Sequence, residues 1–345
     1  MPARGGRHAA DGSPTEKCKP VSDERDWEIP RELQPDPDEY SFDLNRALES
    51  VVALSSTVPP DAFTATTLGT ERTGSGVVIR EDGLVLTIGY LITEAEHVWL
   101  RSLGSRPTPG HALAYDQETG FGLVQALGRL ALPSLPVGRS DSLRIGDSVV
   151  VASGGGRPHA IASKVVARQE FAGYWEYLLD DAIFTAPAHP FWGGAALIGS
   201  EGRLLGIGSL LVQRGDGQGR RVDINMCVPI DHLTPILNDL LTFGRVNKPS
   251  RPWLGMFAAE QEEGIIVVGL AKGGPAEKAG VQVGDRVVAV GAEESGDLAT
   301  LWQNVWSAGT AGAEVRLSLM RDEITTTVAI RSADRAQFLR APTLH

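Results

Sequence analysis

The sequence predicts a mostly β protein of more than one domain. Short apolar runs of strand length recur between residues 49 and 246, and Gly, Asp or Pro punctuates nearly every gap. The chain holds 40 glycines and only 6% aromatic residues, which suits a loop-rich β protein. With 345 residues and 42% apolar content it can bury two or three cores. Closely spaced strands of this kind favour antiparallel barrels or a sandwich.

The segments before and after these strands have different patterns. Residues 1–40 are rich in Pro, Asp, Glu, Gly and Arg without periodicity, so we expect a disordered acidic tail. A short helix is predicted from Ser41, because Leu44 and Leu48 fall on one face. Residues 231–241 predict an amphipathic helix capped by Asp231, with Pro235 in its first turn.

A proline-marked polar linker at residues 245–252 precedes a second pattern. Strands are predicted at 264–268, 286–290, 315–320 and 325–330, and a helix at 297–307. The predicted domains are the tail 1–40, a barrel domain 41–244, the linker 245–252, a C-terminal domain 253–333 and a tail 334–345.

Charge and composition exclude several functions. The net charge of −11, without a clustered Lys/Arg run, gives no footprint for nucleic acid. Cys18 and Cys227 are expected to be unpaired, Cys227 in an apolar run, and no metal or cofactor spacing occurs. The first 40 residues lack the apolar core of a signal peptide, and no apolar run reaches 18 residues. We therefore expect a cytoplasmic protein with no integral membrane segment, or a periplasmic one if translation starts further upstream.

Two motifs carry a family resemblance. Gly274-Pro-Ala-Glu-Lys-Ala-Gly-Val-Gln-Val-Gly-Asp285 is close to Ser-Pro-Ala-x-x-Ala-Gly-Leu-x-x-Gly-Asp, a PDZ signature. His189-Pro-Phe-Trp-Gly-Gly-Ala-Ala-Leu197 is similar to the active-site loop Asn-Pro-Gly-Asn-Ser-Gly-Gly-Pro-Leu of trypsin-like HtrA/Deg proteases. From about Ala47 to Ile330 the chain resembles that family. The resemblance implies a trypsin-like double six-stranded β-barrel followed by a PDZ domain, itself a β-sandwich with helices.

The catalytic triad of that family is missing from the matching positions. The histidine position falls on Tyr90, after Leu-Thr-Ile-Gly, and the aspartate position on Gly120. The nucleophile position falls on Gly193. A tyrosine with an ordinary pKa near 10 is a poor base at pH 7, and glycine offers neither a carboxylate nor a nucleophile. No residue of the triad is intact.

The loop that forms the oxyanion hole in the family is altered as well. Phe191 and Trp192 replace a small Gly-Asn pair, and we expect them to fill the old cleft. Their alternative role is an apolar patch that binds peptide. His189 precedes a proline and could face the cleft, but a catalytic role would need a nucleophile about 3 Å away.

The PDZ resemblance implies a peptide-binding groove. PDZ domains bind an extended C-terminal peptide by strand addition, and a loop of amides holds its carboxylate. Loop residues Trp253, Leu254, Gly255 and Met256 would hold the carboxylate. Helix residues Leu298, Leu301, Trp302 and Val305 would line the pocket, with a place in the domain core as an equal alternative for Leu301 and Val305.

Three functions follow from these residues. The first is a pseudoprotease that binds polypeptide C-termini or unfolded segments without cutting them, as a chaperone, adaptor or regulator. The second is an active serine endopeptidase of protein quality control, which the fold alone would suggest. The third is a structural oligomerisation scaffold, since the family commonly forms trimers and Tyr40, Phe42 and Leu44 could serve such a contact.

Overall fold

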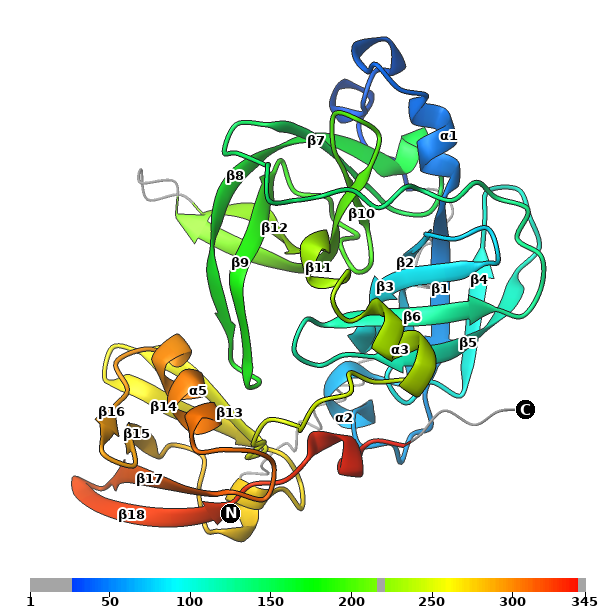
Figure 1. Ribbon diagram of the computed structural model, residues 1–345. Coiled ribbons are helices and arrows are strands. Elements are labelled where there is room, and N and C mark those ends of the chain that lie inside the picture. Colours follow the sequence, from blue (N-terminus) through cyan, green and yellow to red (C-terminus); the bar gives the residue numbers. More distant parts are fainter. Residues whose placement is uncertain (1–26, 216–220, 341–345) are drawn as a thin grey trace, which may run out of the picture.

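Three β units follow one another in the computed structural model, which describes residues 27–215 and 221–340 (Figure 1). In those ranges two closed barrels of six strands each precede an antiparallel sheet that carries one long helix. The predicted mostly β fold class, a double barrel with a smaller C-terminal domain, is confirmed.

The first barrel has the strand order β1-β2-β3-β6-β5-β4. Nearly all residues of the neighbouring strands β3 and β6 are buried, and most of them are apolar, so the barrel has an apolar core. The strands are β1 (Val51–Thr57), β2 (Glu71–Val78), β3 (Leu84–Ile88), β4 (His97–Arg101), β5 (Thr108–Tyr115) and β6 (Phe121–Ala126).

The second barrel has the order β10-β11-β12-β9-β8-β7. Strands β8 and β9 extend beyond the barrel as a long hairpin, whose tip reaches the C-terminal domain (Figure 1). The strands are β7 (Ser148–Ala152), β8 (Ala160–Gly173), β9 (Tyr177–Ala186), β10 (Ala196–Ile198), β11 (Leu204–Gly215) and β12 (Arg221–Pro229).

The C-terminal sheet has the order β13-β14-β15-β17-β18, with β16 paired to β15. Its core cluster is separate from those of the barrels and includes residues of α5. The strands are β13 (Met256–Gln261), β14 (Gly264–Leu270), β15 (Arg286–Val290), β16 (Glu293–Glu294), β17 (Glu314–Arg321) and β18 (Ile324–Arg331).

Short helices connect the strands, and two of them match the predictions. The carboxylate of Asp43 accepts a hydrogen bond from the Arg46 amide and caps α1; that of Asp297 does the same for the Thr300 amide and α5. Leu44, suggested above as an oligomer contact, is 1% exposed in the barrel core and is unavailable for one. The helices are α1 (Leu44–Glu49), α2 (Ala65–Leu68), α3 (Leu237–Phe243), α4 (Pro275–Lys278) and α5 (Leu298–Ser307), with 3₁₀ turns η2 (Arg31–Leu33), η3 (Pro37–Glu39), η4 (Gly89–Leu91), η5 (Arg157–His159), η6 (Ile230–His232) and η7 (Arg335–Phe338).

The predicted disorder of residues 1–40 is wrong for residues 27–40; residues 1–26 lie outside the described ranges. Two apolar residues anchor this polar stretch to the second barrel. Ile29 is 3% exposed in the barrel's outer core cluster, and its amide donates to the Pro158 carbonyl at 2.8 Å. The Trp27 ring packs against the same cluster. Composition alone does not predict that this segment is ordered, because the apolar residues that anchor it are few among many polar ones.

The predicted C-terminal tail, of which the structure describes residues 334–340, packs against the rest of the protein. The Phe338 ring lies 4.8 Å from that of Trp253 and 5.7 Å from that of Phe63, between centroids. Beyond it, the Arg340 amide donates to the Glu94 carboxylate at 3.0 Å. The segment therefore packs between the C-terminal domain and the first barrel.

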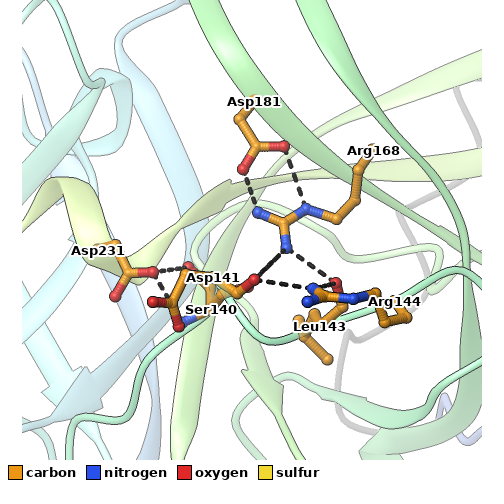
Figure 2. A network of polar contacts seen from close by, with 7 residues as sticks. All are labelled: Ser140, Asp141, Leu143, Arg144, Arg168, Asp181 and Asp231. Atoms are coloured by element: carbon orange, nitrogen blue, oxygen red, sulfur yellow. Dashed lines mark hydrogen bonds and ion pairs between the residues drawn. The ribbon is translucent and has the colours of Figure 1, made fainter.

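The predicted helix over residues 231–241 begins later than expected, at Leu237. The carboxylate of Asp231 accepts hydrogen bonds from both the amide and the hydroxyl of Ser140, at 2.9 Å each (Figure 2). Ser140 lies in the connector between the barrels, residues 127–147. Arg168 binds the same connector by donating to the Ser140 carbonyl at 2.7 Å, and it forms an ion pair with Asp181. Asp231 thus secures the connector instead of capping a helix, and Pro235 precedes the helix.

Candidate functional site

The structure brings Tyr90 and Gly193 together where the two barrels meet. Tyr90 lies in η4, directly after β3, and Gly193 lies in the loop that precedes β10. A Cβ atom built on Gly193 would lie only 2.9 Å from the Tyr90 hydroxyl oxygen. Gly120 adjoins them, because its carbonyl accepts a hydrogen bond of 2.7 Å from the amide of Gly89, next to Tyr90. The three positions matched to the triad, Tyr90, Gly120 and Gly193, are therefore close together in space; we call this region the triad corner.

The Tyr90 hydroxyl is a hydrogen-bond donor in this corner. It donates to the Ser209 carbonyl at 2.8 Å. Burial raises the pKa of Tyr90 well above its ordinary value, although a side-chain hydrogen bond with Trp192 opposes the shift. At neutral pH the phenol keeps its proton, so it cannot act as a general base there.

Gly120 has a backbone that an aspartate would not adopt easily. Its φ is +83°, in the left-handed region that favours glycine. A Cβ atom there would lie 3.3 Å from Cδ1 of Ile88 and 3.5 Å from the Tyr177 hydroxyl oxygen. An aspartate at this position would therefore have a strained backbone, and its side chain would begin beside Ile88 and Tyr177 instead of beside Tyr90.

Two amides that flank Gly193 in the sequence, those of Phe191 and Gly194, donate to groups of the protein itself. The Phe191 amide donates to Nδ1 of His189 at 3.0 Å, and the Gly194 amide donates to the Gly208 carbonyl at 2.9 Å. By the family resemblance, Phe191 takes the place of the glycine two residues before the nucleophile, whose amide helps to form the oxyanion hole. Since this amide already binds His189, it is not available to a substrate oxygen.

The two loop aromatics behave differently. Trp192 is partly buried and bonds to Tyr90, in agreement with a cleft-filling role. The expectation is wrong for Phe191, whose side chain is 42% exposed and packs edge-on against Trp27, 4.4 Å away between centroids. Trp27 belongs to the N-terminal segment, so this contact could not be foreseen from the loop.

His189 is a structural residue and does not face the cleft. It is fully buried, and its Nε2 lies 3.0 Å from the His159 carbonyl. Because Nδ1 accepts the Phe191 amide, the proton resides on Nε2. Burial lowers the pKa of His189 to about 4, and the side chain of Asn225 exchanges two hydrogen bonds with its backbone. The ring is therefore neutral and held in place.

A second site lies at the start of the C-terminal sheet. The amides of Leu254, Gly255 and Met256 converge on the carboxylate of Glu176. The distances are 3.0 Å from the Leu254 nitrogen and 2.9 Å from the Met256 nitrogen. Gly255 has φ +71°, and consecutive amides around a left-handed residue form a concave anion-binding nest. The sequence predicted this amide loop but not its occupant.

Glu176 is the residue that sequence reasoning missed. It lies at the tip of the β8–β9 hairpin, is 5% exposed and has φ +58°. One signal was present in the sequence: a lone glutamate among the aromatic residues of Gly173-Tyr-Trp-Glu-Tyr177. An acidic side chain in so apolar a turn needs a partner if it is buried.

The helix residues assigned to the peptide pocket are all buried. Leu301, Trp302 and Val305 have no exposed surface, and Leu298 is 7% exposed. They belong to the core cluster of the C-terminal domain. The Trp302 ring N–H donates to the Gly173 carbonyl of the hairpin tip at 2.9 Å. For Leu301 and Val305 this burial agrees with the alternative of a place in the domain core.

Cys227 is buried and free, as predicted, whereas Cys18 lies outside the described residues. In residues 27–215 and 221–340, no helix has the length and apolar character needed to span a bilayer.

The comparisons with known proteins agree with the two-part architecture. The trypsin-like peptidase domain family matches residues 74–207, and the PDZ domain family matches residues 252–331. A solved structure of the HtrA-type protease AlgW with a decapeptide superposes with a TM-score of 0.51 at 20% identity, covering 87% of this chain and 98% of that one. At this identity the likeness supports the fold alone.

Curated relatives are named probable periplasmic serine endoproteases, DegP-like. The protein of Hahella chejuensis is 25% identical over 75% of this chain and 57% of its own length. That of Pseudomonas fluorescens is 28% identical over 72% of this chain and 53% of its own length. The chain thus spans about half the length of these relatives, and their names give no support to the expected cytoplasmic location. The chain consists of a trypsin-like peptidase domain followed by a PDZ domain and is homologous to the HtrA/DegP serine endoproteases.

Proposed function

We propose that this chain is a pseudoprotease, which binds polypeptide C-termini or unfolded segments through its PDZ domain without hydrolysing them. One observation carries the proposal. The corner where Gly193 faces Tyr90 contains a protonated phenol bonded to the Ser209 carbonyl, and it leaves only 2.9 Å for the first atom of any side chain on Gly193.

The chemistry of acyl transfer supports the same reading. A serine protease needs a nucleophile, a base and amides aimed at the developing oxyanion. At the matched positions Gly193 offers no nucleophile, and burial keeps Tyr90 protonated. The amide of Phe191 is bound to His189. Loss of one such element costs orders of magnitude in rate, and here each is compromised.

The alternative is an active serine endopeptidase, which the names of the relatives favour. It would require a relocated nucleophile. The nearby hydroxyl of Thr87 donates to the Ser75 carbonyl at 2.7 Å, and the Ser75 hydroxyl accepts the Gly154 amide at 3.1 Å. Cys227 is fully buried, and burial raises the pKa of its thiol to about 12. None of these groups has the geometry of an activated nucleophile.

Location and assembly remain part of the proposal. The relatives are named periplasmic, and we place this chain in the same compartment. A scaffold role in a homotrimer would have to use surfaces other than Leu44, which is buried in its own barrel.

The test is hydrolysis of unfolded fluorescent casein by the purified chain, with parallel labelling by a fluorophosphonate probe. We expect neither turnover nor label. An active HtrA-type protease in the same assay provides the positive control. Turnover together with a label that maps to a serine of this chain would overturn the proposal and establish the endopeptidase.

A further inference from the structure

The tip of the β8–β9 hairpin presents a carboxylate to the PDZ domain in the manner of a ligand. The Glu176 carboxylate lies in the amide nest formed by Leu254, Gly255 and Met256. In PDZ recognition such a loop of amides binds the terminal carboxylate of a peptide. Glu176 supplies the same chemical group from a side chain of the same molecule.

The backbone of the tip also imitates an added strand. The Ala258 amide, on the edge strand β13, donates to the Tyr174 carbonyl at 2.9 Å. The Trp302 ring on α5 donates to the Gly173 carbonyl, also at 2.9 Å. The tip therefore bonds both to the strand and to the helix of the PDZ domain, between which a peptide would have to pass.

We propose that Glu176 acts as an internal substitute for a C-terminus and keeps the PDZ domain closed, so that a peptide with a free terminal carboxylate binds only by displacing the hairpin tip. This inference rests on the proposed peptide-binding function and adds its regulation. The partner it implies is an extended peptide whose terminal carboxylate competes for the amides of residues 254–256.

Several features make the internal contact displaceable. Glu176 has a left-handed backbone, which is costly for a residue with a Cβ atom. Burial raises the pKa of its carboxyl to about 7 against the lowering effect of the three amides and of Arg335, so the ionised form is held at a cost. Glu176, Arg335 and Trp253 also line a cavity, and the other charged residues around it are Asp116, Glu118, Arg245, Lys248, Arg251 and Asp334. A peptide carboxylate would meet the same amides without needing the strained turn.

The binding experiment uses the full chain and three proteins: wild type, Glu176→Gln and, as a matched control, Glu170→Gln. Glu170 is an exposed glutamate on the same hairpin. The probe is a fluorescent decapeptide with a free carboxylate, titrated at about pH 8, where the ordinary pKa of a peptide carboxyl leaves it ionised. We expect Glu176→Gln to lower the apparent Kd about tenfold, because the carboxamide replaces one of the two acceptor oxygens by an NH2 group, which cannot accept a hydrogen bond from the amides, so the open fraction rises. The Glu170→Gln chain should bind as wild type does.

Hydrogen exchange at the amides of residues 254–256 gives a second readout that needs no peptide. In the wild type these amides should be protected, and in Glu176→Gln they should exchange at least about tenfold faster, while Glu170→Gln leaves them unchanged. Equal protection in all three proteins, or equal peptide affinity in wild type and Glu176→Gln, would overturn the internal-ligand proposal. Loss of protection without any peptide binding would leave the closed contact standing and refute the peptide-binding function instead.

Discussion

Placing a serine at position 193 should destabilise the chain and should not create an enzyme. The φ of Gly193 lies outside the left-handed region, so its backbone accepts a side chain. The obstacle is Tyr90, whose hydroxyl oxygen would lie 2.9 Å from the new Cβ, closer than such contacts ordinarily come. Overpacking of this kind costs about 1–3 kcal/mol. We therefore expect Gly193→Ser and Gly193→Ala to lose similar stability, about 1–2 kcal/mol, because the Cβ causes the clash.

A double-mutant cycle with Tyr90→Phe tests the contact directly. Alone, Tyr90→Phe removes the hydrogen bond to the Ser209 carbonyl and should cost about 1 kcal/mol. In that background Gly193→Ser should cost little further, which gives a coupling energy of about 1 kcal/mol or more in urea unfolding. Additive losses, or casein turnover by the single Gly193→Ser variant, would refute the placement of these two residues.

Three further outcomes are expected. Ile29→Ala should destabilise the second barrel by about 2–4 kcal/mol in urea unfolding, against little effect of Leu33→Ala on the exposed side of the same segment; equal effects would contradict the anchoring role. Gly255→Ala should weaken peptide binding and lose more stability in urea unfolding than Gly280→Ala. Both positions have a positive φ, of +71° and +89°, but the new Cβ would lie 3.0 Å from the Trp253 ring at position 255 and in open space at position 280. The hairpin contact should loosen as pH rises through about 7, because docking raises the pKa of Glu176 above its ordinary 4.5 and the protonated form is favoured when docked. Peptide affinity of the wild type should therefore increase at least about tenfold from about pH 5.5 to 8, and a flat profile, or the same slope in Glu176→Gln, would contradict this assignment.

The sequence predicted the fold well because its signals are local. Alternating apolar runs separated by turn residues specify strands, and the run from Gly274 to Asp285 identifies the C-terminal domain. The helix α5 was predicted for the same reason, because apolar residues recur at helical spacing along one face; its cap, Asp297, was recognised only in the structure. The positions matched to the triad, Tyr90 and Gly193, were found because short motifs surround them.

What the sequence could not reveal depends on contacts between distant segments. Ile29 and Phe338 anchor segments that composition assigns to tails. Asp231 has a helix-capping residue type, but its carboxylate is engaged by Ser140, 91 residues away. Glu176 meets the PDZ amides across 78 to 80 residues of sequence, and neither local propensity nor a motif encodes that meeting.

The most direct test of binding without cleavage follows one peptide through both steps. A labelled decapeptide with a free C-terminus is titrated with the full chain by fluorescence anisotropy, and the mixture is then analysed by mass spectrometry. We predict saturable binding that is lost when the C-terminus is amidated, with the peptide recovered intact. Cleavage of the peptide, or binding that is indifferent to amidation, would contradict the account.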